Sequence, residues 1–122
     1  MRTLLKFEEA AMFGICIFFL YRLHVAWWVY LLLVIGPDIS IAGYSFGNRV
    51  GADCYNFFHH KGVAIGAFAI GVILNSHVGD IVSIAGIILF GHSSMDRMLG
   101  YGLKLNKGFK FTHLGMIGKK DN

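Results

Sequence analysis

The sequence predicts an all-α membrane protein, a four-helix transmembrane bundle with up-and-down topology and both termini in the cytoplasm. Composition is the first reason: 56% of the 122 residues are hydrophobic and only 15% are charged, whereas soluble domains carry about 25% charged residues. The second is a series of four apolar runs, at 10–21, 25–37, 62–74 and 81–91. The third is that ionisable residues collect at alternating ends of these runs, as antiparallel helices require.

The first two predicted helices are joined by a tight turn at His24. We expect the first over 4–23, retained in the protein because no small-residue cleavage site follows its apolar run. The second is expected over 25–46. With its polar flanks, each helix reaches about 20 residues, which is enough to cross a hydrocarbon core of about 30 Å.

The last two predicted helices follow Gly47-Asn48, a pair that favours a chain break. The third is expected over 51–76 and the fourth over 79–101, with Asp80 as a start signal. The sequence then becomes basic and mixed, which predicts a cytoplasmic tail over 102–122. A single membrane domain, residues 1–122, accommodates all of these elements.

Charge asymmetry predicts the orientation of the bundle. Of the 11 Lys and Arg residues, only Arg22 lies on the side opposite the termini in this arrangement. Cytoplasmic loops carry an excess of Lys and Arg, so both termini and the loop around Arg49 are predicted to be cytoplasmic. We therefore expect a multi-pass protein of the cell (inner) membrane, in contact with the lipid bilayer and its anionic lipids. The basic residues form no recognition motif, so no nucleic-acid partner is predicted.

Acidic and imidazole side chains are predicted to converge on one layer of the bundle. Counting about 1.5 Å of rise per helical residue from the external turns places them within a band of roughly 8 Å near the cytoplasmic face. The residues in this layer are Glu8, Asp38, His59, His92 and Asp96. Ionisable residues inside a membrane are costly and are usually functional.

This layer has the composition of a metal site. His92 and Asp96 are four residues apart and therefore share a helix face. Bundle metal sites are built from such inward-facing His and carboxylate side chains. We expect His59, His92 and Asp96 to hold a divalent metal ion, with zinc, manganese and iron all compatible with the donors. Asp38 and Glu8 are expected to act as further ligands or as a general base.

Other candidate site residues lie in loops and in the tail. His113 could fold back over the layer as a ligand or acid–base group. Arg49, Arg97 and Lys104 could attract an anionic headgroup, although each also fits a plain positive-inside anchor. The alternative for the whole layer is a polar network in which Asp38, Asp96 and their neighbours satisfy one another without a ligand.

Two backbone features bear on this layer. Pro37 lacks an N–H, so it is predicted to kink the second helix and to free the carbonyl of Leu33. Pairs of glycines four residues apart, Gly43 with Gly47 and Gly62 with Gly66, predict close helix–helix approach.

Several motifs together resemble one family. They are Pro37-Asp38 with Gly43-Tyr44, the run Tyr55-Asn56-Phe57-Phe58-His59, the segment from His92 through Asp96-Arg97-Met98-Leu99-Gly100-Tyr101-Gly102-Leu103-Lys104, and Phe109 through Thr112-His113-Leu114-Gly115. With Glu8, these resemble the small bacterial integral-membrane family known as domain of unknown function 4260. The resemblance implies a four-helix membrane protein without an established activity. Its His and Asp motifs look loosely like those of membrane-bound metal-dependent hydrolases, which is an analogy only.

Three functions follow from this interpretation. The first is a metal-dependent hydrolase acting on a lipid or amphipathic substrate. The second is electron transfer, with His59 and His92 as axial ligands to a haem. The third is a non-enzymatic transporter or complex subunit, and a transporter of this size would need to form a homodimer to make a pathway.

Overall fold

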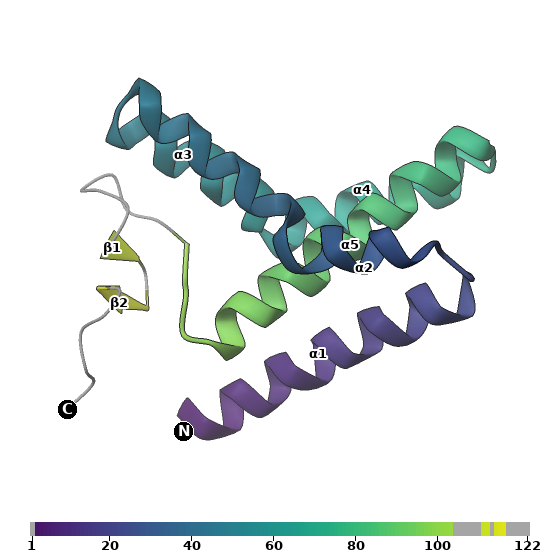
Figure 1. Cartoon of the computed structure of the whole chain (residues 1–122), viewed down its shortest axis with the longest axis horizontal. Helices are drawn as coiled ribbons and strands as arrows, with labels where there is room; N and C mark the ends of the chain where they lie inside the picture. The colour runs from purple at the N-terminus through teal and green to yellow at the C-terminus, as the bar shows by residue number, and fades with distance from the viewer. Residues whose placement is uncertain (1, 104–110, 113, 117–122) are drawn as a thin grey trace.

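The computed structural model describes residues 2–103, 111–112 and 114–116, which are mostly helical (Figure 1). The elements, in order, are α1 (Arg2–Arg22), α2 (Trp27–Ile35), the 3₁₀ helix η1 (Gly36–Phe46), α3 (Asn48–His59), α4 (Lys61–Leu74), α5 (His77–Met98), β1 (Phe111–Thr112) and β2 (Gly115–Met116). The two short strands are antiparallel, with Phe111 opposite Met116.

Two helical stretches are long and apolar enough to cross a membrane. One is Trp27–Phe46, formed by α2 and η1 together, and the other is α5; the bent pair α3 and α4 is a third if it counts as one span. Within the described residues α1 is not among them, and Lys6, Glu8 and Glu9 all lie in its first half. The structure thus shows a helical protein with two or three candidate spans. A fourth span and the side of the membrane on which the termini lie remain predictions.

The predicted helix over 25–46 is one helical stretch, Trp27–Phe46, but its second half is of another type. The α-helix ends at Ile35, and the chain continues as a 3₁₀ helix from Gly36 to Phe46. Pro37 explains where the change occurs, because it cannot donate the backbone hydrogen bond that an α-helix needs there. A 3₁₀ helix rises about 2.0 Å per residue against about 1.5 Å for an α-helix, so the change also lengthens this span.

The predicted single helix over 51–76 is instead broken into α3 and α4, with a bend of 50° between them. The break lies at His60, whose backbone is extended (φ −88°, ψ 122°). The His60 ring caps the new helix: its Nδ1 accepts hydrogen bonds from the backbone N–H groups of Gly62 (3.0 Å) and Val63 (3.4 Å). This ring satisfies N–H groups that the start of a helix leaves without a partner.

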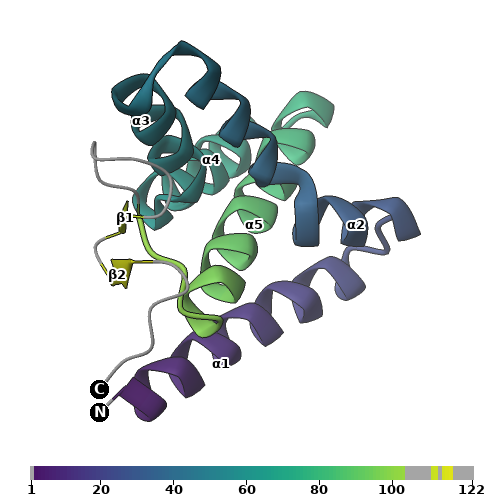
Figure 2. The ribbon, with the colours of Figure 1, turned by 60° about the vertical axis from the view of Figure 1, so that its left-hand side comes forward.

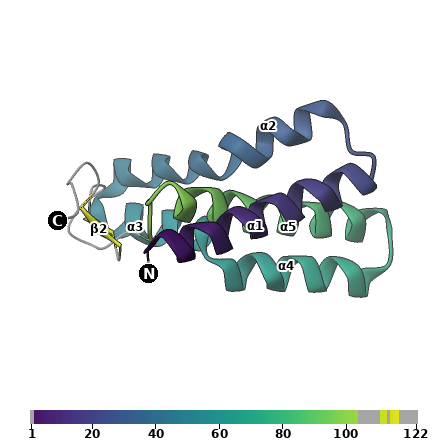
Figure 3. The same ribbon diagram turned by 90° about the horizontal axis from the view of Figure 1, so that it is seen from below.

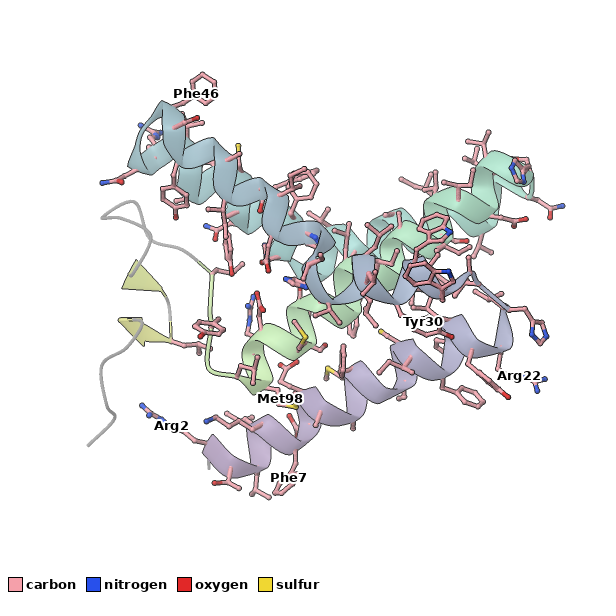
Figure 4. The ribbon with its side chains drawn as sticks, viewed as in Figure 1. Arg2, Phe7, Arg22, Tyr30, Phe46 and Met98 are labelled. Atoms are coloured by element: carbon pink, nitrogen blue, oxygen red, sulfur yellow. The ribbon has the colours of Figure 1, made fainter. Side chains whose placement is uncertain are left out.

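Helix α5 lies at the centre, with α1 and α4 packed along it (Figures 2 and 3). The consecutive helices η1 and α3 pack against each other as a hairpin. Cys16 and Leu20 of α1, Val29 and Leu33 of α2, and Ile87 of α5 form the buried apolar core. Outside this core, large apolar side chains are exposed. Phe46, which projects from the tip of η1 in Figure 4, is 80% exposed. An apolar exterior of this kind suits contact with lipid.

Glycines allow the closest helix–helix contacts, but not all of the predicted ones do so. A Cβ added at Gly86 of α5 would lie 2.6 Å from the Phe68 backbone nitrogen of α4. Gly43 behaves as predicted, since an added Cβ would lie 2.8 Å from the Cys54 Cβ. The prediction for Gly66 is wrong, because a Cβ there would meet no described atom within 4 Å.

Candidate metal site

Four ionisable side chains from three helical elements meet beside α5. We call them the His/Asp cluster: Asp38 of η1, His59 at the end of α3, and His92 and Asp96 of α5. One potential ligand atom from each lies within 4.8 Å of all the others, so the group could hold a metal ion. The η1–α3 hairpin brings the first two residues to α5, where the last two share one face.

The distances in the His/Asp cluster suit a small cation. His59 Nε2 lies 3.2 Å from Asp38 Oδ1 and 3.3 Å from Asp96 Oδ2. His92 Nε2 lies 3.0 Å from the same Asp38 oxygen and 3.5 Å from the same Asp96 oxygen. A tetrahedral zinc site with metal–ligand bonds of about 2.0–2.1 Å has ligand–ligand separations of about 3.3 Å. The four measured separations fall around that value.

Both imidazole rings are oriented by backbone carbonyls. His59 Nδ1 donates to the Tyr55 carbonyl (2.8 Å), and His92 Nδ1 donates to the Leu33 carbonyl (3.0 Å). A carbonyl oxygen can only accept, so Nδ1 carries the proton in each ring. In a neutral ring Nε2 is then an unprotonated acceptor. Metal-ligating histidines are typically oriented in this way.

With this tautomer, the Nε2 acceptors of the rings face the acceptor oxygens of the carboxylates. Each neutral ring would direct its Nε2 lone pair at carboxylate oxygens of Asp38 and Asp96, which is repulsive without a positive charge between them. Two arrangements remove the repulsion. Either a metal cation sits among the four atoms, or additional protons do, bound to the rings as imidazolium ions or to the carboxylates as carboxylic acids.

The carbonyl that orients His92 is available because of Pro37. In a regular α-helix the Leu33 carbonyl would accept the N–H of residue 37, which proline lacks. The sequence predicts that this carbonyl is freed, and in the structure it accepts the ring of His92. The helix break in this span therefore helps to position a potential ligand.

Tyr55 supports the His/Asp cluster in two ways. Its hydroxyl donates to Asp96 Oδ2 (3.0 Å), and its ring stacks on His59 with the centroids 3.7 Å apart and the planes inclined by 8°. Tyr55 is not among the predicted site residues. Its position four residues before His59, on the same helix face, is the signal that could have identified it.

The His/Asp cluster is buried on one side and open on the other. The side chains of both histidines are fully buried and that of Asp96 is 8% exposed, whereas that of Asp38 is 41% exposed. Burying charged groups is costly unless they are neutralised. Asp38 therefore marks the edge at which water or a substrate can reach the site.

Ser93 and Arg97 close the break between α3 and α4. The helix break leaves the His59 carbonyl without a partner of its own, and it accepts the Ser93 hydroxyl (2.7 Å) and an Arg97 Nη2 hydrogen bond (3.3 Å). Arg97 also donates to the Tyr101 carbonyl (3.1 Å). Arg97, predicted to attract a headgroup, thus also anchors the backbone of a cluster residue.

The other predicted site residues lie outside the His/Asp cluster. Glu8 is exposed on α1 and is not a member of the cluster, so its role as a ligand or base stays a prediction. The next residue, Glu9, turns inward instead and forms an ion pair with Lys61. Arg49 is exposed at the start of α3. His113 and Lys104 lie outside the described residues.

Comparison with known proteins supports the predicted resemblance. The family model described as "Domain of unknown function (DUF4260)" matches residues 2–117, which include the whole His/Asp cluster. No curated protein and no solved structure matches the chain. The geometry above is therefore the basis for inferring a function.

Proposed function

This chain belongs to the DUF4260 family, and we propose from its site that it is a membrane-embedded, metal-dependent hydrolase acting on a lipid or another amphipathic substrate. The observation that carries this proposal is the orientation of His59 and His92. Their Nδ1 atoms donate to carbonyls, and their Nε2 atoms converge on two carboxylates within 3.5 Å. A divalent cation is the ligand that suits such a set of acceptors.

The cluster residues have different roles in this proposal. His59, His92 and Asp96 are buried and hold the ion. Asp38 is the exposed member, and it serves as a further ligand or as the base that accepts a proton from the attacking water. A bound ion lowers the pKa of water and polarises a carbonyl or phosphoryl oxygen. Water would add to the carbonyl carbon or the phosphorus of the substrate and give a proton to Asp38; the bond to the leaving oxygen would then break, and Asp38 would pass its proton to that oxygen.

One feature of the chain supports a lipid or amphipathic substrate. The helices that carry the His/Asp cluster include both stretches that are long and apolar enough to span a membrane. A site carried on candidate membrane spans has lipids as its nearest neighbours, which supports a lipid or amphipathic substrate. We propose that the protein spans a bacterial inner membrane in several passes, with both termini in the cytoplasm.

Metal analysis of the purified protein tests the proposal. We expect close to one equivalent of zinc, manganese or iron per chain in the wild type, and loss of the metal in His92→Ala and Asp96→Asn. His77→Ala, which changes an exposed histidine at the start of the same helix, is the matched control and should retain the metal. A wild-type protein that binds none of these metals stoichiometrically would overturn the proposal.

A non-enzymatic role is the alternative that a specific observation favours. The His/Asp cluster offers four protein ligands, and structural zinc sites are closed by four such ligands. A transporter or complex subunit could use a closed site of this kind. Hydrolysis of phospholipid or ester substrates by the metal-loaded wild type, abolished in Asp38→Asn, would distinguish the hydrolase from this alternative.

The geometry disfavours the haem alternative. A haem would have to lie between His59 and His92, but their ring centroids are 4.9 Å apart. Two carboxylate oxygens already occupy the space between their Nε2 atoms.

A further inference from the structure

A basic cavity lies between the first turns of α1 and the end of α5, the two helix ends marked by Arg2 and Met98 in Figure 4. Its volume is about 480 Å³, and its lining includes the cationic side chains of Arg2, Lys6 and Arg97 and the carboxylate of Glu9. Small-molecule sites typically enclose about 300–1,000 Å³. The cavity is thus large enough for a ligand, and three of its seven lining residues are cationic.

The carboxylate in this lining is already neutralised. Glu9 forms an ion pair with Lys61 of α4, and both side chains are largely buried. The guanidinium of Arg97 is held by two backbone carbonyls, those of His59 and Tyr101. Carbonyls fix its position without cancelling its charge. The cavity therefore suits an anionic group, and Arg97 would place that group beside the His/Asp cluster.

An apolar groove lies on the other side of the Glu9–Lys61 pair. It crosses α1, α4 and α5, encloses about 300 Å³, and is lined only by apolar residues, among them Met12, Phe19, Phe68 and Phe90. Gly86 of α5 forms part of its floor. A groove of this composition in a membrane protein suits an acyl chain.

Lys61 stands at the junction of the basic cavity and the apolar groove. Its ammonium contacts Glu9 of the cavity, lies 3.3 Å from the Met12 sulfur of the groove, and lies 5.4 Å from the centroid of the Phe90 ring. Glu9 and Met12 are three residues apart and share a face of α1. The charged and the apolar spaces therefore lie on the two sides of the Glu9–Lys61 pair, both along α1.

We propose that these two spaces together bind one anionic phospholipid from the surrounding bilayer. Its phosphate lies in the basic cavity near Lys6 and Arg97, and one acyl chain lies in the groove between α1 and α4. The Glu9–Lys61 pair marks the boundary between head and tail. That this lipid is the substrate rests on the proposed hydrolase function, whereas the binding itself does not.

Lipid binding to the full-length protein in detergent, followed by native mass spectrometry, tests the inference. The probes are phosphatidylglycerol and phosphatidylcholine with identical acyl chains, and inorganic phosphate as the head alone. We expect one phosphatidylglycerol per chain, bound more tightly than phosphatidylcholine, and no measurable competition by inorganic phosphate at equal concentration. Equal binding of the two lipids, or competition by phosphate as strong as that by the lipid, would overturn the inference.

Two pairs of variants locate the lipid. Lys6→Gln should lower the preference for phosphatidylglycerol by about fivefold, because one basic residue near a lipid surface contributes about 1 kcal/mol. Arg22→Gln, at the exposed opposite end of α1, should leave this preference unchanged. Ile65→Trp, which fills the groove, should weaken binding of both lipids, whereas Ile73→Trp, on an exposed position of the same helix outside the groove, should not. Unaltered binding in both Lys6→Gln and Ile65→Trp contradicts the inference.

The metal-site variant His92→Ala separates this inference from the proposed hydrolase. Phosphatidylglycerol should bind His92→Ala as it binds the wild type, because His92 lines neither space. Loss of lipid binding with metal retained would refute the lipid site alone. A wild-type protein that binds the lipid but no metal would refute the hydrolase alone.

Discussion

Two groups of ionisable side chains lie inside this helical protein, and their charges are compensated in different ways. Glu9 and Lys61 form a pair of opposite charges, each side chain no more than 25% exposed. In the His/Asp cluster, by contrast, every atom directed at the centre is an acceptor when both rings are neutral and donate their Nδ1 protons to carbonyls. The Glu9–Lys61 pair is complete as it stands, whereas the cluster needs either a cation or additional protons. Burial alone therefore does not indicate a functional site; an imbalance of donors and acceptors does.

The largest expected effect of a substitution is on the metal affinity of the His/Asp cluster. His92→Ala removes a ligand and leaves the Leu33 carbonyl without its donor, so metal affinity should fall by more than about 100-fold, beyond the usual 10- to 100-fold effect of an outer-shell change. Competition with a chromophoric chelator measures this affinity. An affinity within threefold of the wild type would mean that the cluster holds no metal.

A change in the Glu9–Lys61 pair should affect stability and not metal binding. Lys61→Met leaves the Glu9 carboxylate largely buried without its partner, which should lower the free energy of unfolding by about 1–3 kcal/mol. Adding Glu9→Gln should restore most of the loss, because both charges are then gone. Chemical unfolding in detergent measures the stability, and the chelator assay should give wild-type affinity for both proteins. Weaker metal binding by the double variant would contradict the separation of the two groups.

Tyr55→Phe tests the support around the cluster. It removes the hydrogen bond to Asp96 but keeps the ring that stacks on His59. Because outer-shell partners typically contribute 10- to 100-fold, we expect metal affinity to fall by about tenfold. The matched control is Tyr21→Phe on an exposed position of α1, which should have no effect. An equal loss in both variants would show that the hydroxyl of Tyr55 plays no special part.

The smallest expected effect tests which glutamate of α1 faces inward, Glu8 or Glu9. Glu8 is exposed, so Glu8→Gln should change neither metal affinity nor the free energy of unfolding by more than about 0.5 kcal/mol. Glu9→Gln should instead destabilise the protein, because it leaves Lys61 without its carboxylate. The same unfolding and chelator assays compare the two variants. A larger effect from Glu8 than from Glu9 would reverse this assignment.

The sequence predicted how far along each helix a residue lies better than it predicted which face of the helix the residue occupies. Counting the rise per residue placed Asp38, His59, His92 and Asp96 in one layer, and the structure has their ligand atoms within 4.8 Å of one another. Glu8 lies at a suitable height too, but height does not determine the face of the helix. Residues one apart point about 100° away from each other, and here it is Glu9 that faces inward.

The helix breaks were predictable only where a residue forces them. Pro37 necessarily removes a hydrogen bond, so the sequence located that break and the carbonyl it frees. It did not predict a 3₁₀ helix over 11 residues, because such helices rarely exceed 3–4 residues. The break at His60 had no signal, since histidine is not among the favoured N-cap residues. Its ring acts as a cap only because the chain bends there to bring His59 to α5.

X-ray absorption spectroscopy of the purified, metal-loaded protein tests most directly whether the His/Asp cluster coordinates an ion. We predict two imidazole nitrogens and carboxylate oxygen in the first shell, with bond lengths of about 2.0–2.2 Å for zinc, and loss of both imidazole contributions in the His59→Ala/His92→Ala double variant. A bound metal whose spectrum lacks imidazole, or a spectrum unchanged in the double variant, would contradict the account.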